Sequence, residues 1–433
     1  MKTTYQYRLR PTKQQATQLE EWLETCRRTY NRMLCERFDW WENNRCSIDR
    51  CSLISCGIAP LKDKPNYYSQ QNSLVLLKAK YPDIKLVQSQ VLQNVVKRVD
   101  LAYERFVVGD SGGKRSGRPR FKGKGRYRSL TFTQMKQTCL SGNKITLPKL
   151  GVLKLVVHRP ISDGFQIKTA TVIRQADGWY VSLSLQDDTV PTILPDIQIE
   201  NTVGIDLGLK DFLVTSEGES VPIPRFARKS EKHSQRLNKA LSRKKKKGTK
   251  RRQNTGRRLS KYYQKVARQR KDFHFKVANQ LLSKYDVVAY EDLNIKGLAK
   301  THLSKSILDA GWSEFLSIVT AKAERAGRIT VAVNPNGTTQ RCSGCDAVVP
   351  KTLADRWHSC ACGVSLDRDV NAAINIKKLA LGHRVSKARG VRRNTGTAKR
   401  EARSMPDLQV GVGSMSRSKG PGNQGGGAVA ELW

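Results

Sequence analysis

Long apolar runs are missing from this sequence of 433 residues. No stretch approaches about 18 consecutive apolar residues, which is the length that spans a bilayer. A signal peptide also has no counterpart, because the first residues, MKTTYQYRLRPTKQQ, are polar where an apolar segment would be needed. These absences argue against a membrane partner or secretion and predict a cytoplasmic protein. In that reducing compartment, we expect the ten cysteines to be thiols or metal ligands rather than disulfides.

Acidic residues are scarce as well. The chain has 37 Asp and Glu against 79 Lys and Arg, which gives a formal net charge of +42. Such a surface repels itself unless a polyanion screens it, and nucleic acid is the commonest polyanion in a cell. The hydrophobic content of 38% is adequate for folding, and the length suits two or three domains. The composition therefore predicts a folded protein with a nucleic-acid partner. An anionic membrane is the rival partner, and the missing apolar runs count against it.

Strands and helices alternate in the first two hundred residues. TYQYRLRP is typical of a strand, and Thr12 with Gln15 forms a capping-box pattern ahead of apolar residues at helical spacing up to Leu34. A second amphipathic helix is predicted over 88–107, and Asp177-Gly178 predicts a hairpin. Between 110 and 128 the chain is basic and rich in glycine, which suits phosphate contact.

A strongly basic segment runs from 225 to 272, with 21 Lys or Arg and two acids. Leucines, tyrosines and a valine recur among the charges, which favours long basic helices that pack on one side and contact phosphates on the other. The alternative is a solvated or disordered surface. The residues predicted to contact nucleic acid are Lys244, Lys245, Lys246, Lys247, Arg251 and Arg252. After residue 383 the Gly-, Ser- and Arg-rich tail is expected to be disordered.

Three acids stand at positions that suit catalysis. Asp206 ends the apolar run NTVGID, and Glu291 ends the apolar run YDVVAYE, so each is predicted at the carboxyl end of a buried strand. Asp292 follows Glu291 but should point to the opposite face. A helix is predicted to begin within SLDRDVNAAINI, where Asp367 suits the N-cap and Asp369 the first turn, so we favour Asp369 as the functional acid.

A buried carboxylate is costly unless a cation or hydrogen bonds offset its desolvation. Asp206, Glu291 and Asp369 together could hold two Mg²⁺ about 3.5–4 Å apart, which is an arrangement that hydrolyses phosphodiesters. The alternative for Asp206 alone is a solvated or hydrogen-bonded carboxylate at a strand end. GIDLG also resembles the first phosphate loop of actin-like ATPases, but the further Gly-rich loops that those proteins need are missing from the sequence.

Four cysteines form two close pairs. Cys342 and Cys345 are separated by two residues, Cys360 and Cys362 by one, and fourteen residues lie between the pairs. This spacing predicts a zinc ribbon that holds one structural Zn²⁺ through four thiolates, with His358 as a possible substitute ligand. The other group of cysteines, Cys46, Cys51 and Cys56, is spaced unlike a zinc knuckle and is interpreted as ordinary thiols.

These features occur in a specific order: GIDLGLKDF, VVAYEDLNIKGL, TTQRCSGC and DRDVNAAINI. In this order they resemble the TnpB family, the OrfB-type proteins of bacterial insertion sequences, which look like compact ancestors of type V CRISPR effectors. The resemblance covers roughly 200–380 closely and the N-terminal part more loosely. It implies a multidomain α+β protein in which a RuvC-like nuclease domain of the RNase H fold is interrupted by the zinc ribbon. A β-barrel wedge with a helical recognition insertion would precede it.

The domain boundaries that follow are 1–200 for the wedge, 201–335 for the first nuclease part, 336–366 for the zinc ribbon, 367–382 for the last nuclease part and 383–433 for the tail. The resemblance also implies a guide RNA transcribed from the element's own end, a double-stranded DNA target next to a short adjacent motif, and a bacterial, nucleoid-associated protein. Two alternatives remain: an RNase H-fold transposase that performs strand transfer with the same acids, and an inactive nucleic-acid-binding accessory protein.

Overall fold

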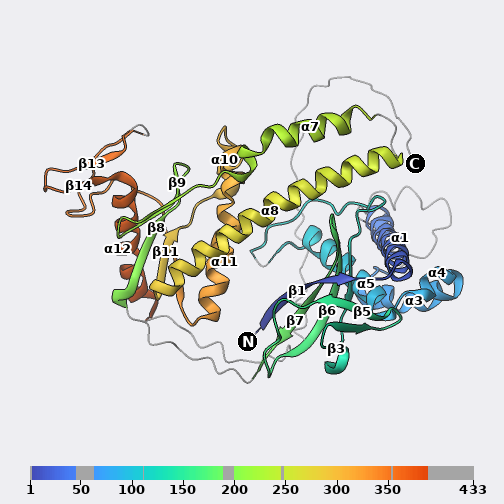
Figure 1. Cartoon of the computed structure of the whole chain (residues 1–433). Helices are drawn as coiled ribbons and strands as arrows, with labels where there is room; N and C mark the ends of the chain where they lie inside the picture. Colours follow the sequence, from blue (N-terminus) through green and yellow to red (C-terminus); the bar gives the residue numbers. More distant parts are fainter. Residues whose placement is uncertain are drawn as a thin grey trace, which may run out of the picture. The chain divides into compact units, whose positions relative to one another are not determined.

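A computed structural model describes residues 2–44, 63–110, 112–188, 199–244, 248–352 and 355–388 (Figure 1). The chain divides into two units, Met1–Arg384 and Val385–Trp433. The predicted disordered tail and Cys46, Cys51 and Cys56 lie almost entirely outside the described residues, although the last helix continues to Ala388. Within those residues, no helix has the length and apolar character that crossing a bilayer requires.

The N-terminal sheet has seven strands, in the order β2-β6-β7-β1-β5-β4-β3, and all of its pairs are antiparallel. The strands are β1 (Lys2–Arg10), β2 (Ser129–Phe132), β3 (Leu140–Ser141), β4 (Lys144–Leu147), β5 (Gly151–Val156), β6 (Gln166–Gln175) and β7 (Gly178–Gln186). The predicted hairpin at Asp177-Gly178 is confirmed, because it joins β6 to β7. The β-barrel that the resemblance implies is not shown as a closed barrel: in the described part of the chain, no pairing joins the edge strands β2 and β3.

Four helices share one hydrophobic core with this sheet. They are α1 (Lys13–Asn44), α3 (Tyr67–Lys80), α4 (Pro82–Leu86) and α5 (Ser89–Val107). The capping box at the start of α1 is present as predicted, since the Thr12 N–H donates to Gln15 Oε1 (3.0 Å) and the Gln15 N–H donates to Thr12 Oγ1 (3.3 Å). The helix predicted over 88–107 corresponds to α5, which buries the valines of its apolar face.

The second sheet has five strands, in the order β10-β9-β8-β11-β12. These strands are β8 (Thr202–Asp206), β9 (Asp211–Thr215), β10 (Ser220–Pro222), β11 (Val287–Glu291) and β12 (Ile329–Val333). Strands β8, β9 and β10 form an antiparallel meander, whereas β11 runs parallel to both β8 and β12. Parallel strands end at the same edge of a sheet, which is where open α/β sheets place their ligands.

Helices cover both faces of the five-stranded sheet (Figure 1). On one face, α8 (Lys250–Lys284) and α11 (Trp312–Arg325) pack on Val203, Ile205 and Val288. On the other face, α12 (Arg368–Ala388) packs on Ala289 and Val333. The remaining helices are α6 (Phe226–Lys229), α7 (Glu231–Ser242), α9 (Ile295–Leu298) and α10 (Ser304–Ala310). The basic segment is therefore helical, as predicted.

A small ribbon lies between β12 and α12. Its two strands, β13 (Trp357–Ser359) and β14 (Ser365–Asp367), form an antiparallel hairpin that carries the second cysteine pair in its turn. Because β14 ends at Asp367 and α12 begins at Arg368, the ribbon leads directly into the helix of the third predicted acid.

Candidate nuclease site

The first two predicted acids stand side by side. Asp206 is the last residue of β8 and Glu291 is the last residue of β11. The parallel register pairs Ile205 with Tyr290, so the residues that follow them lie together at the carboxyl ends of both strands. Glu291 is buried, at 9% exposure, while Asp292 is exposed. The difference in burial agrees with strand alternation, and the choice of Glu291 as the site acid stays a prediction.

The third acid comes from the start of α12. Asp367 precedes the helix, and its Oδ1 accepts a hydrogen bond from the Asp369 N–H (2.8 Å), which is the work of an N-cap. Asp369 lies in the first turn, where Arg368 pairs with it at 3.1 Å. The sequence-based division of roles between the two acids is consistent with this local structure. Arg368, which no motif argument singled out, adds a positive charge to the cluster.

A glycine allows α12 to approach the sheet closely enough to bring Asp369 to the strand ends. A Cβ atom added to Gly204 in β8 would lie 2.0 Å from the carbonyl oxygen of Ala373 and 2.7 Å from the backbone nitrogen of Lys377. Real Cβ atoms do not approach backbone atoms so closely, so strand and helix touch here backbone to backbone. Ala372 and Ala373 are fully buried at this contact, which gives a physical reason for small residues in DRDVNAAINI.

We expect Gly204→Ala to push α12 away from β8 and to separate Asp369 from Asp206. The obstruction is backbone, which cannot rotate away as a side chain can, so the cost should be on the order of 1–3 kcal/mol, as for overpacked cores. Denaturant unfolding measures the loss of stability, and a cleavage assay measures the displaced acid. Gly117→Ala is the matched control for lost backbone freedom, since open space surrounds its Cβ position and its backbone is not left-handed. Equal stability of Gly204→Ala and wild type would contradict the close contact.

Burial and the two neighbouring carboxylates raise the pKa of Asp206. Burial, followed by the charges of Glu291 and Asp369, raises the pKa of Asp206 to about 7, although Arg368 acts in the opposite direction. Burial also raises the pKa of Glu291, and the hydroxyl of Thr338, which donates to Glu291 Oε1, partly opposes this rise. Two buried acids with raised pKa values next to a third carboxylate favour a cation between them.

This shift predicts how pH changes stability in Mg²⁺-free buffer. The ordinary pKa of Asp206, 3.8, is raised to about 7 in the folded chain, so between these values the folded state binds the proton more tightly. Stability should therefore fall as the pH rises from about 4 to 7. Asp206→Asn removes the charge at nearly constant shape and should be more stable than wild type at pH 8 by a few kcal/mol, roughly. Denaturant midpoints at pH 4 and pH 8 test this, and an identical difference at both values would contradict it.

The three carboxylates are not as tightly gathered as the cysteines. In the described part of the chain, the cysteine cluster alone forms a group of three or more His, Cys, Asp or Glu side chains whose ligand atoms all lie within 4.8 Å of one another. Mutual repulsion and the pairing of Asp369 with Arg368 are sufficient physical reasons for the wider spacing of the acids.

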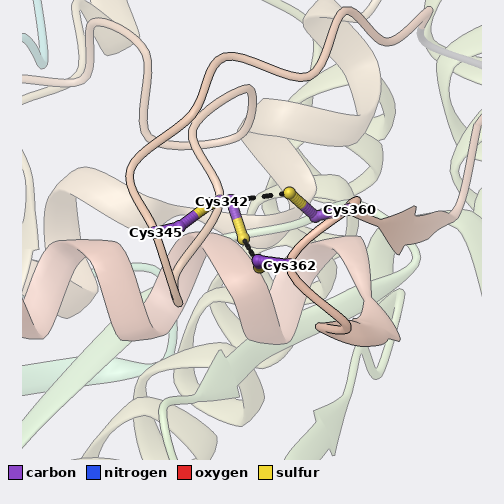
Figure 2. A group of neighbouring side chains, drawn as sticks. All are labelled: Cys342, Cys345, Cys360 and Cys362. Atoms are coloured by element: carbon purple, nitrogen blue, oxygen red, sulfur yellow. Dashed lines mark hydrogen bonds between the residues drawn. The ribbon is translucent and has the colours of Figure 1, made fainter.

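The four predicted zinc ligands meet (Figure 2). Cys342 Sγ lies 3.5 Å from Cys362 Sγ, and Cys345 Sγ lies 3.6 Å from Cys360 Sγ. Burial opposes ionisation of Cys342, but the nearby His358 ring, two backbone amides and a neighbouring thiol outweigh it and lower its pKa to about 5. Since zinc binds thiolates at tetrahedral sites, this cluster is consistent with one structural zinc.

His358 is not among the gathered ligand atoms. Its ring is fully buried, Nδ1 accepts from the Lys351 ammonium, and Nε2 has no hydrogen-bond partner. Four thiolates complete a tetrahedral site, so His358 is better placed to support the cluster than to replace a ligand.

Two buried asparagines attach the ribbon to α12. Asn371 Oδ1 accepts from the Ser343 N–H (2.9 Å), and Asn371 Nδ2 donates to the Arg341 carbonyl (2.7 Å). Asn375 Nδ2 donates to the carbonyls of Thr338 and Arg341, each at 2.8 Å. These bonds connect the first cysteine knuckle to the helix of Asp369 and to the threonine that contacts Glu291. The cysteine cluster is therefore linked by hydrogen bonds to the helix that carries Asp369 and to the segment that contacts Glu291.

The predicted phosphate-contacting residues differ in their surroundings. The Arg252 guanidinium donates to the carbonyls of Leu241 and Lys244, and the Lys244 ammonium donates to Thr255, so both close the turn between α7 and α8. Arg251 is exposed. Lys245, Lys246 and Lys247 lie outside the described residues. Contact with nucleic acid stays a prediction for this group.

Known proteins match the chain over most of its length. A family model described as "Probable transposase" (OrfB_IS605) matches residues 184–302, and one described as "Cas12f1-like, TNB domain" matches 312–376. A protein of Streptomyces pristinaespiralis is 30% identical over 382 residues, which cover 87% of this chain and 89% of the relative. The chain belongs to the TnpB family.

A second relative, from Escherichia coli K12, is 26% identical over 88% of this chain and 92% of its own length. Both relatives are named "Putative RNA-guided DNA endonuclease", the second with the addition InsQ. A solved structure of a Cas12f1–sgRNA–target DNA complex has a similar fold, with a TM-score of 0.51 and 16% identity over 83% of this chain and 82% of that one. The TnpB resemblance inferred from the motifs is thereby confirmed.

One further model, described as "Helix-turn-helix domain", matches residues 1–46. In this TnpB-family chain the described part of that segment is strand β1 followed by the single long helix α1, which ends at Asn44. The description therefore does not fit the local structure here.

Proposed function

We propose that this protein is an RNA-guided, Mg²⁺-dependent DNA endonuclease of an insertion sequence. The observation that carries the proposal is the convergence of Asp206, Glu291 and Asp369 at the carboxyl ends of the parallel strands β8 and β11, where Glu291 and Asp369 both raise the pKa of Asp206. The names of the two relatives that span the chain support the same activity.

The domain assignment follows from the family. We assign the five-stranded sheet and α12 to a RuvC-like nuclease of the RNase H type, interrupted by the zinc ribbon of 336–366. We assign the seven-stranded sheet to the wedge and α1, α3, α4 and α5 to the recognition insertion. The mixed meander-and-parallel order of β10-β9-β8-β11-β12 is compatible with this assignment.

The donor set suits a hard divalent cation, because it consists of carboxylate oxygens, and burial raises the pKa of Asp206 and of Glu291. Two Mg²⁺ held by Asp206, Glu291 and Asp369 would activate a water and stabilise the leaving oxygen of a phosphodiester. The chain's own contribution is to fix the carboxylates: Thr338 orients Glu291, the close contact at Gly204 places α12, and Asp367 caps its first turn.

The guide RNA is the proposed partner of the basic surface. A net charge of +42 requires a polyanion, and the exposed Arg251 on α8 is the described member of the predicted set that is open to solvent. Base pairing by the guide would select the DNA target, while the protein reads a short adjacent motif.

The experiment that tests the proposal is purification followed by reprogramming. The protein is expected to purify with a discrete RNA, and changing the guide portion of that RNA should redirect Mg²⁺-dependent cleavage to a matching DNA. Joining of DNA ends without any RNA preference would favour the transposase alternative. Binding of RNA and DNA without cleavage would favour the inactive accessory protein.

A further inference from the structure

One large aromatic side chain stands out on the zinc ribbon. Trp357 in β13 is 58% exposed, whereas Trp22, Trp179 and Trp312 are each at most 8% exposed. Its indole N–H donates to Ser365 Oγ across the hairpin (2.8 Å), so the edge of the ring is held. An exposed ring that cannot rotate freely loses little entropy when something packs on its face.

The ribbon connects this ring to the acid site. Trp357 pairs with Asp367, which lies two residues before Asp369. The Arg368 N–H donates to the Arg356 carbonyl (2.9 Å), and the Arg368 side chain donates to the Asp355 carbonyl (3.1 Å). A group that stacks on Trp357 is therefore positioned relative to the first turn of α12.

The ribbon segment 341–367 has no formal net charge, so attraction between opposite charges does not explain what its surface would bind. Between 341 and 367 the sequence has three bases, Arg341, Lys351 and Arg356, against three acids, Asp346, Asp355 and Asp367. The rest of the chain is strongly basic, so the ribbon surface differs from it. A neutral surface with an immobilised aromatic ring suits base stacking, which tolerates any sequence because every base has a π-face.

We propose that Trp357 is a stacking platform for an unpaired base of the DNA strand that enters the acid site. The proposal rests on the proposed nuclease function and specifies the form of its substrate: a single strand with at least one unstacked base beside the ribbon. Stacking would hold the strand at a fixed distance from Asp369.

The test measures binding of a fluorescein-labelled single-stranded DNA oligonucleotide to the full-length protein at several salt concentrations, without Mg²⁺. Trp357→Ala is expected to weaken binding about 5-fold to 100-fold at every salt concentration with an unchanged salt slope, and Trp357→Phe should restore most of the affinity. Val348→Ala is the matched control, because Val348 is 61% exposed on the same ribbon but has no ring. Elemental zinc analysis checks that each variant keeps the ribbon folded.

A second measurement takes its main result from the wild-type protein. Abasic sites are placed one at a time along the oligonucleotide. Wild type should lose affinity about 5-fold to 100-fold when the missing base lies at a restricted set of positions. Trp357→Leu should bind all of these oligonucleotides equally well. Unchanged DNA binding of Trp357→Ala, or a loss seen with an RNA oligonucleotide and not with DNA, would overturn the proposal. Because the assay reads binding alone, its result is separate from failure of RNA-guided cleavage.

Discussion

Alanine at Asp206, Glu291 or Asp369 is expected to abolish DNA cleavage, with a loss of about 10³-fold or more in rate, because a two-metal site supplies several kcal/mol of transition-state stabilisation. Binding of nucleic acid should stay within about 2-fold, since the loss of a carboxylate leaves the basic surface unchanged. Single-turnover cleavage and filter binding on the same preparations measure the two effects.

Two neighbouring acids serve as controls for this result. Asp292→Ala removes an exposed carboxylate beside Glu291 and should cleave like wild type. Asp367→Ala removes the cap of α12 and should cost about 1 kcal/mol of stability with partial loss of cleavage. Full activity in Asp369→Ala together with complete loss in Asp367→Ala would reverse the assignment of the third acid.

Serine at any one of Cys342, Cys345, Cys360 or Cys362 is expected to remove one tightly bound zinc and to unfold the ribbon. Structural zinc sites contribute on the order of 10–16 kcal/mol of apparent binding energy, and a ribbon of this size has no core of its own to replace it. Cleavage should fall as well, because Asn371 and Asn375 connect the cysteine knuckle to α12. Elemental analysis and limited proteolysis around 340–364 measure these effects.

Cys35 provides the matched control for zinc, since its thiol is exposed on α1 and belongs to no cluster in the described residues. Cys35→Ser should retain zinc and proteolytic resistance. Freshly purified wild-type protein without zinc would refute the ribbon assignment, whatever the variants do.

The individual elements of the site could be predicted from short-range patterns. Strand alternation distinguishes the role of Glu291 from that of Asp292, and the rules of helix capping distinguish Asp367 from Asp369. Each rule involves only a few neighbouring residues. The capping box at Thr12 and the hairpin at Asp177 are local in the same sense. The spacing of the four cysteines was sufficient to predict that they gather, because tetrahedral zinc geometry restricts the length of the loops between its ligands.

Contacts between distant residues could not be predicted in this way. The approach of Ala373 to Gly204 and the hydrogen bond from Thr338 to Glu291 depend on how the sheet and α12 pack. The same packing gives Arg252 an internal role at the α7–α8 turn, where composition alone suggested a phosphate contact. Closure of the N-terminal sheet depends on pairing between strand edges, which no sequence pattern specified.

The position of α12 in the chain has a consequence for synthesis. Asp206 and Glu291 emerge from the ribosome well before Asp369. The helix α12, which packs on Gly204, is translated only after the whole ribbon. A nascent or prematurely terminated chain therefore carries two acids without the third. In the nuclease proposed above, the acid site therefore cannot be complete until the segment that carries Asp369 has been translated.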